Sequence, residues 1–354
     1  MHTSVEEEGR GGEGIKRSGE GATDASGAEE RPLEVLTVGE MVVDFISDEK
    51  TDTLSNATTF RRYLGGSPAN IAVYVSKLGG TSAVIAKTGI GAFGKFLKSE
   101  LQRHGVVTDY LLMDHRTHTT VIFVSSTVAT PDFEEFRSGD YLLRPEEVSE
   151  EAIARTSVVH ASTFALSREP CRSAVIGAFR QAREMGKLVS LDPNYSRRVW
   201  PDYKEAQKVI REAYRHVNVT KPSADDARRV FGPNHEPEEY VEMFHDLGAE
   251  TVVFTMGEDG NLISEGGKIS AHVPTRPVEV VDATGAGDAF WAGFLTATLD
   301  GNPAERSVLF AREVVEQKLQ TKGPLPSEID REIIYARLNE KAAEDGEKGR
   351  RTGP

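Results

Sequence analysis

The sequence predicts an α/β protein whose parallel sheet is covered by helices on both faces. From Val158 onward, short apolar runs alternate regularly with segments of helical periodicity, and this order is typical of βα units. Two other runs, Thr119–Thr127 and Glu134–Arg137, alternate like strands, but their polarity does not suit a buried sheet. They predict a small second sheet apart from the main one. No internal repeat or linker divides the chain.

The elements are expected in the following order. The strands are Leu33–Phe45, Thr58–Tyr63, Ser82–Thr88, Tyr110–Met113, Val158–His160, Lys187–Asp192, Val217–Thr220 and Thr251–Thr255. The helices after the first are Lys95–His104, Pro170–Met185, Tyr203–His216 and Ala224–Phe231. The first helix is expected to begin at Ser67 as its N-cap, with Pro68 at the first helical position and Gly79 as its stop.

Composition restricts the class of function. The chain has 354 residues, a formal net charge of -14 and a mean hydropathy of -0.39. This acidic balance disfavours general binding to nucleic acid or to anionic membranes. No apolar run is long enough to span a bilayer. Cys171 is the only cysteine, which excludes an internal disulfide and favours a reducing compartment, the cytoplasm.

Both ends of the sequence are expected to be polar tails. Residues 1–31 are rich in Gly, Glu and Ser, which predicts a disordered acidic tail. They lack the apolar core of a secretory signal. Residues 339–354 are highly charged and are expected to fray.

One glycine pattern favours a different class of protein. The run Gly89–Gly94 matches Gly-x-Gly-x-x-Gly at the start of a helix, and Asp114 follows at about the distance of a ribose-binding acid. By this pattern alone the chain would be a dinucleotide-dependent dehydrogenase. Against it, two elements precede the motif, whereas the dinucleotide fingerprint heads its βαβ unit.

The stretch 280–290 is the strongest candidate for chemistry. Two valines end a strand, Gly285, Ala286 and Gly287 allow a sharp turn, and an apolar helix follows. A helix N-terminus exposes unpaired N–H groups and the positive end of a dipole, so it binds anions well. Asp288 is a carboxylate at that position. It is either a helix cap or a residue that does chemistry.

Two long motifs resemble a known family. Gly65-Gly66-Ser67-Pro68-Ala69-Asn70 follows the first strands, and Asp282-Ala283-Thr284-Gly285-Ala286-Gly287-Asp288-Ala289-Phe290 lies near the other end of the chain. Together they resemble the ribokinase/phosphofructokinase-B (PfkB) family of carbohydrate kinases, over about Leu33–Leu338. Within that family the run Ser167–Ala174 and Asp192-Pro193-Asn194 look most like fructokinases.

The resemblance implies a Rossmann-like, three-layer ribokinase fold over residues 32–338, with a small β-sheet lid from about 42–63 and 119–137. It also implies a site for a small sugar and a site for ATP. The implied sugar-binding residues are Asp44, Gly66, Asn70 and Arg137. The implied ATP-binding residues are Thr255, Gly257, Gly260, Ser223 and Asp226, with the phosphates at Gly285–Gly287. The lid, whose strand edges would be exposed, implies a homodimer.

The implied mechanism is phosphoryl transfer, in which positioning and charge stabilisation matter most. Asp288 would take the hydroxyl proton of the sugar, while the N–H groups of Ala286 and Gly287 would stabilise the charge on the transferred group. Mg²⁺ would bridge the β- and γ-phosphates with few protein ligands. Asp282 and Thr284 match positions that help to bind a monovalent cation such as K⁺.

Three departures from the family pattern limit these implications. Gly89–Gly94 stands where the family has Gly-Asp-Asp-x-Phe-Gly. Ser223 and Asp226 stand where it has Asn-x-x-Glu. Arg312 and Glu313 stand where it has Asn and small residues lining the adenine pocket. These two are either an exposed helical face or an obstruction to ATP.

The function expected is ATP-dependent phosphorylation of fructose. A kinase for 2-keto-3-deoxygluconate or a related sugar acid is the alternative on the same scaffold. A catalytically weak homologue that acts through binding is the alternative of another class.

Overall fold

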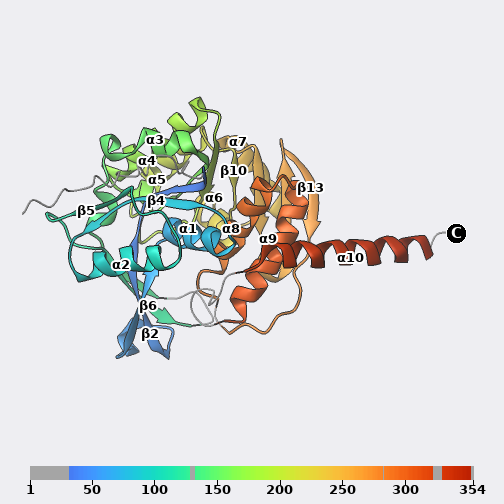
Figure 1. Ribbon diagram of the computed structural model, residues 1–354, viewed down its shortest axis with the longest axis horizontal. Helices are drawn as coiled ribbons and strands as arrows, with labels where there is room; N and C mark the ends of the chain where they lie inside the picture. Colours follow the sequence, from blue (N-terminus) through green and yellow to red (C-terminus); the bar gives the residue numbers. More distant parts are fainter. Residues whose placement is uncertain (1–31, 128–131, 282, 322–328, 352–354) are drawn as a thin grey trace, which may run out of the picture. The chain divides into compact units, whose positions relative to one another are not determined.

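The computed structural model describes residues 32–127, 132–281, 283–321 and 329–351, and the expected disordered tail 1–31 lies outside them. Within these ranges the chain folds around a nine-stranded sheet in the order β13-β12-β11-β10-β9-β8-β1-β4-β5 (Figure 1). Its strands are β1 Leu33–Val38, β4 Ser82–Gly89, β5 Leu111–Asp114, β8 Thr156–Ser162, β9 Leu188–Asp192, β10 Val219–Thr220, β11 Thr251–Thr255, β12 Asn261–Glu265 and β13 Lys268–Val273. All neighbours from β5 to β11 are parallel, while β12 and β13 are added antiparallel.

Helices pack on both faces of this sheet, as the βα rhythm predicts. The α-helices of the described residues are α1 Ser67–Lys77, α2 Ala92–Arg103, α3 Glu150–Arg155, α4 Cys171–Glu184, α5 Tyr203–Tyr214, α6 Ala224–Phe231, α7 Pro237–Leu247, α8 Ala286–Leu299, α9 Ala304–Leu319 and α10 Arg331–Arg351. The last helix therefore runs through most of the segment 339–354.

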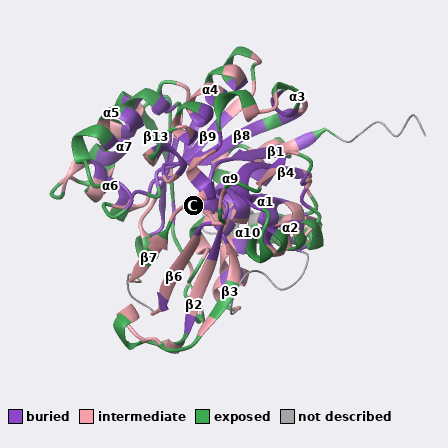
Figure 2. Cartoon of the chain, turned by 90° about the vertical axis from the view of Figure 1, so that its left-hand side faces the viewer, coloured by how far each residue is buried: buried purple, intermediate pink, exposed green. Residues whose placement is uncertain are grey.

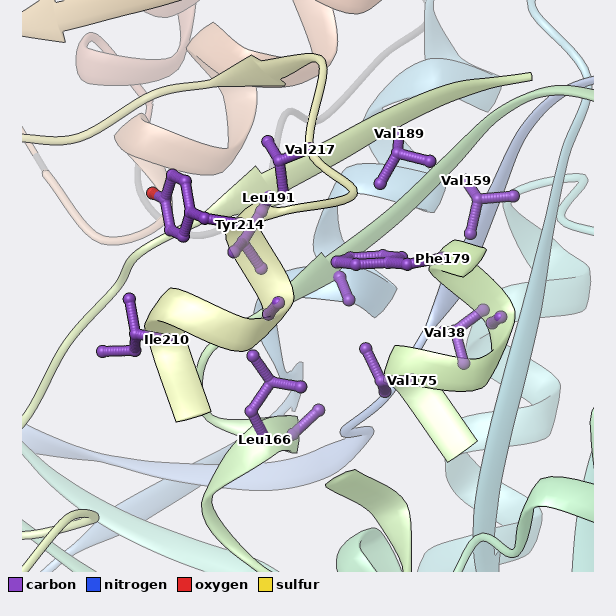
Figure 3. Close-up of a cluster of buried hydrophobic side chains, with 14 of the residues drawn as sticks. Val38, Val159, Leu166, Val175, Phe179, Val189, Leu191, Ile210, Tyr214 and Val217 are labelled. Carbon is purple, nitrogen blue, oxygen red and sulfur yellow. The ribbon is translucent and has the colours of Figure 1, made fainter. Parts of the chain in front are cut away.

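Side-chain alternation along each strand divides the core between the two faces. In β8, Val159 lies beside Phe179 of α4, in a cluster that also contains Tyr214 of α5 (Figure 3). Its neighbour Val158 points the other way, into a cluster with Trp291 of α8. Successive strand residues face opposite sides of a sheet, so a continuous apolar run such as β8 serves two cores at once.

The predicted small sheet is present. Strands β2 Val42–Lys50, β3 Phe60–Gly65, β6 Val121–Ser126 and β7 Phe133–Phe136 form it in the order β3-β2-β6-β7. These strands are much less buried than those of the large sheet (Figure 2). We call this sheet the lid. It confirms the interpretation of the polar strands as a unit apart from the main sheet.

Two of the glycines in the run Gly89–Gly94 pack backbone against backbone. A Cβ on Gly94 would lie 1.8 Å from the Gly89 carbonyl oxygen, and one on Gly89 would lie 2.6 Å from the Thr117 carbonyl oxygen. Asp114, the expected ribose acid, is instead paired with Arg116 at 2.7 Å. These glycines thus allow the chain to turn tightly from β4 into α2.

No helix in the described part of the chain has the length and apolarity needed to cross a membrane.

Candidate active site

The carboxyl ends of neighbouring parallel strands meet at one edge of the large sheet and line a cavity of about 760 Å³. Thr255 ends β11, Lys221 directly follows β10, and both line this cavity. Ala286 and Gly287, at the start of α8, line it too. We call it the first cavity. Its volume is within the range of small-molecule sites.

A second cavity of about 340 Å³ lies between the lid and the turn before α8. Asp44 of β2, Asn70 of α1, and Thr284 and Gly285 of that turn line it. Gly285 and Ala286 are adjacent in sequence, so the N-terminus of α8 separates the two cavities.

Asp288 lies in the first turn of α8 and reaches across to α1. Its Oδ1 accepts a hydrogen bond from the Ser67 hydroxyl at 2.7 Å, and its Oδ2 accepts one from the Asn70 amide at 2.9 Å. It does not itself line either cavity, but Asn70 lines the second. These bonds tie Asp288 to a different helix, so its carboxylate is held for a purpose other than capping its own.

The prediction that Ser67 is the N-cap of α1 is wrong. Gly66 is the N-cap, with φ +93°, and Ser67 occupies the first helical position. A Cβ on Gly66 would lie 2.6 Å from the Glu40 carbonyl oxygen, so only glycine fits at this position. This places the Ser67 hydroxyl beside Asp288 instead of over the helix end.

Burial governs the electrostatics of this carboxylate. It raises the pKa of Asp288, while the hydrogen bonds from Ser67 and Asn70 and the charge of Lys221 oppose the rise. An aspartate with a raised pKa is a stronger base than an exposed one once it is ionised.

Asp44 is partly buried and has fewer compensating partners. Burial, with repulsion from Asp288 added, raises the pKa of Asp44 to about 7. The backbone makes room for this side chain, since a Cβ on Gly65 would lie 2.1 Å from its Oδ2. The structure brings Asp44 and Asn70 to one cavity, as expected for sugar-binding residues.

Arg137 is placed elsewhere. It lines neither cavity, and its side chain is 1% exposed. Its guanidinium is paired with Asp140 at 2.6 Å, donates to the Ser167 hydroxyl at 2.6 Å and stacks on the ring of Phe164. These partners make Arg137 part of a structural ion pair. Its role in sugar binding stays a prediction.

Of the five residues expected at ATP, two line the first cavity: Thr255 and Gly257. Gly260 shapes the turn into β12 with φ +90°. Ser223 and Asp226 form the reciprocal capping box of α6, in which each side chain accepts the other's backbone N–H. Asp226 also accepts the backbone N–H of Tyr195 at 2.9 Å.

Both residues suspected of obstructing ATP point inward. Arg312 lines the first cavity, where its Nη1 donates to the Pro274 carbonyl oxygen at 2.9 Å. Glu313 is buried and paired with Arg276 at 2.6 Å and Lys341 at 2.9 Å. The interpretation of these residues as an exposed helical face is wrong, but the cavity that Arg312 borders remains open.

No three His, Cys, Asp or Glu side chains of the described residues come together as metal ligands. Of the residues implied for a monovalent cation, Asp282 lies outside the described residues, and Thr284 lines the second cavity.

One residue of the site, Lys221, was not predicted from the sequence. Lys221 forms an ion pair with Asp192 at 3.0 Å, and both side chains are almost fully buried. Asp192 belongs to the Asp192-Pro193-Asn194 motif, but no sequence pattern distinguished Lys221 from the other lysines and arginines, which number 42 in all. A lysine following a strand is usually solvent-exposed, and only the three-dimensional structure distinguishes this one.

Similarity to known proteins covers most of the chain. A model of the pfkB family of carbohydrate kinases matches residues 33–330. The chain is 36% identical over 298 residues to the ATP-dependent 6-phosphofructokinase of Thermoanaerobacterium thermosaccharolyticum, covering 84% of this chain and 91% of the relative. It is 35% identical over 282 residues to fructokinase-2 of Oryza sativa, covering 78% and 82%.

Among solved structures, Halothermothrix orenii fructokinase superposes with a TM-score of 0.71 at 38% identity, covering 82% of this chain and 99% of that one. These relatives are sugar kinases, which excludes the dehydrogenase interpretation of Gly89–Gly94. The chain belongs to the pfkB family of carbohydrate kinases.

Proposed function

We propose that this chain is an ATP-dependent fructokinase that transfers the γ-phosphate of ATP to a hydroxyl of fructose. One observation carries the proposal: the N-terminus of α8 stands between two cavities, with Ala286 and Gly287 in the first and Gly285 in the second. A phosphoryl group at that helix end would lie between a nucleotide in the first cavity and a sugar in the second.

In this mechanism ATP occupies the first cavity with its γ-phosphate at the start of α8. The amide of Gly287 and the helix dipole stabilise the charge on the transferred group. The amide of Ala286 already donates to the Ala283 carbonyl oxygen at 3.1 Å, so its donation to phosphate requires that turn to open. Mg²⁺ bound together with ATP would supply charge neutralisation.

Asp288 accepts the hydroxyl proton as the sugar oxygen bonds to phosphorus. Both its oxygens are engaged, by Ser67 and by Asn70. Asn70 lines the second cavity, so a bound sugar can take over its amide and expose Oδ2 of Asp288. The base is thus held in place until the substrate arrives.

The lining of the second cavity favours a neutral sugar. Asp44 and Asp48 bring carboxylates to it, and Lys50 is the one basic side chain among its described lining residues. A sugar acid or a sugar phosphate would add a negative charge beside two carboxylates. Fructose adds none, and its hydroxyls can donate to Asp44.

We also propose that the protein works in the cytoplasm, where ATP is available and its one thiol, Cys171, stays reduced. A homodimer through the lid is consistent with the aromatic side chains that gather there, Phe45, Phe60, Phe123 and Phe136. Phe136 is 54% exposed in the single chain.

An activity panel tests the function. Purified protein, ATP and Mg²⁺ would be assayed with fructose, fructose 6-phosphate, ribose and 2-keto-3-deoxygluconate, with formation of ADP and sugar phosphate as the readout. We expect the highest kcat/KM with fructose. Preference for the sugar acid or for fructose 6-phosphate would overturn the argument from charge, and no transfer to any sugar would favour a binding-only homologue.

A further inference from the structure

We propose that Lys221 is a catalytic residue whose ammonium contacts the phosphoryl group in transfer, and that Asp192 positions it. The inference rests on the proposed function, because it takes the first cavity as the site of a nucleoside triphosphate.

The fold fixes the place of this lysine. Asp192 ends β9 and Lys221 directly follows β10, its parallel neighbour in the large sheet. The side chains are 4% and 7% exposed, and Asp192 Oδ2 lies 3.0 Å from Lys221 Nζ. A lysine anchored between two core strands has little freedom, so its ammonium is preorganised.

The ammonium points to the start of α8. Lys221 lines the first cavity together with Gly287. A Cβ built on Gly287 would lie 3.3 Å from Lys221 Nζ, closer than most Cβ contacts. The ammonium and the N-terminus of α8 therefore converge on one small space, and that space suits an anion.

The surrounding charges keep the lysine protonated. Burial alone lowers the pKa of Lys221, but the carboxylates of Asp192, Asp226 and Asp288 outweigh it and raise the pKa above its ordinary value. An ammonium has three N–H donors, and the ion pair with Asp192 engages one of them. A fixed cation with further donors, beside a helix N-terminus, is suited to phosphate.

Charge balance gives the lysine a role in the reaction. The transferred phosphoryl group must approach Asp288, a carboxylate that would repel it. Lys221 interacts with Asp288 and lines the nucleotide cavity, so it offsets this repulsion as charge spreads over the equatorial oxygens. A contact that strengthens as transfer proceeds raises kcat more than it tightens binding.

The competing explanation is that Lys221 only neutralises Asp192. A double-mutant cycle separates the two roles. Lys221→Met leaves Asp192 buried without its cation, whereas Lys221→Met with Asp192→Asn removes both charges. Lys208→Met, at an exposed lysine on α5, is the control. The readouts are kcat, the melting temperature, and calorimetric affinities for ADP and for β,γ-imido-ATP.

We expect Lys221→Met to lower kcat by roughly 10²–10³-fold, the usual loss for one electrostatic donor to a transition state. It should weaken the imido analogue more than ADP, because only the former has a γ-phosphoryl group. The double variant should regain the melting temperature lost by Lys221→Met but not the activity. Lys221→Arg, which keeps the charge, should retain more activity than Lys221→Met.

Recovery of wild-type kcat in the double variant would overturn the proposal, and so would equal weakening of ADP and the imido analogue. If Lys221→Met does not fold, the double variant, which has no unpaired buried charge, still gives the answer. An inactive wild-type protein would instead refute the proposed function, and this inference with it.

Discussion

Asp44 and Asp288 are two partly buried carboxylates near one another, and their partners differ. Burial raises the pKa of both. For Asp288, hydroxyl and amide donors and the charge of Lys221 oppose this rise, whereas Asp44 has no such favourable partner among the residues that the structure describes. A carboxylate with donors in place is poised as a base, and one lacking them is suited to accept bonds from a ligand.

Replacing Asp44 should therefore affect the sugar more than the nucleotide. In Asp44→Ala we expect the loss of a hydrogen-bond partner worth about 1–3 kcal/mol, seen as a rise in the KM for fructose. The KM for ATP should change little, because Asp44 lines only the second cavity. Steady-state kinetics with each substrate varied in turn measure both constants.

Asp109→Ala, at an exposed aspartate outside both cavities, is the matched control. Equal rises in the two KM values would assign Asp44 a structural role in the lid.

At the scale of elements, α9 determines the character of the nucleotide cavity. Its spacing puts Arg312, Val315, Glu316 and Leu319 on the wall of the first cavity. Glu313 lies beside them in the core, where it holds Arg276 and Lys341. Nε of Arg312 is buried without a hydrogen-bond partner among the described residues, so part of this wall is unsatisfied.

Neighbouring residues of α9 should therefore respond differently to substitution. We expect Arg312→Asn to tighten ATP binding, because it removes a bulky cation from the wall, with little change in melting temperature. We expect Glu313→Ala to lower the stability by about 1–3 kcal/mol, since it removes the carboxylate that pairs with Lys341 and leaves Arg276 with Glu316 alone. Calorimetric titration with ATP and thermal unfolding of both variants measure these effects. Unchanged ATP affinity in Arg312→Asn would mean that the Arg312 guanidinium already leaves room for the adenine ring of ATP.

At the scale of the whole molecule, local patterns predicted most of the fold. The bounds of α6 and β11 agree with the structure to the residue, because capping residues and β-branched runs mark their ends. The hairpin β12–β13 and helix α7 were not predicted. The antiparallel hairpin breaks the βα rhythm on which the prediction depended, and it caps the edge of an otherwise parallel sheet.

The candidate site was predictable only where a motif is continuous in sequence. Gly285, Ala286, Gly287 and Asp288 form one run. The partners of Asp288 are 221 and 218 residues away, so no local pattern could show that Ser67 serves this carboxylate instead of its own helix. The ion pair of Lys221 with Asp192 also joins the ends of two different strands, so no local pattern could reveal it.

The proposed mechanism depends on Asp288 as the base of a phosphoryl transfer. Asparagine keeps the shape of this side chain and can still interact with Ser67, but it cannot accept a proton at neutral pH. Because only the ionised carboxylate is a base, wild-type activity should fall as pH drops below the pKa of Asp288. Burial raises that pKa, so the fall should begin at a higher pH than for an exposed aspartate.

The most direct test is kcat for phosphorylation of fructose by Asp288→Asn, paired with its calorimetric affinity for ATP. We predict that kcat falls by roughly 10²–10⁴-fold, the usual contribution of a placed acid–base group, and that ATP binds as well as before or more tightly. A variant that keeps most of its turnover, with the same acid limb in its pH profile, would contradict the role of Asp288 and the mechanism built on it.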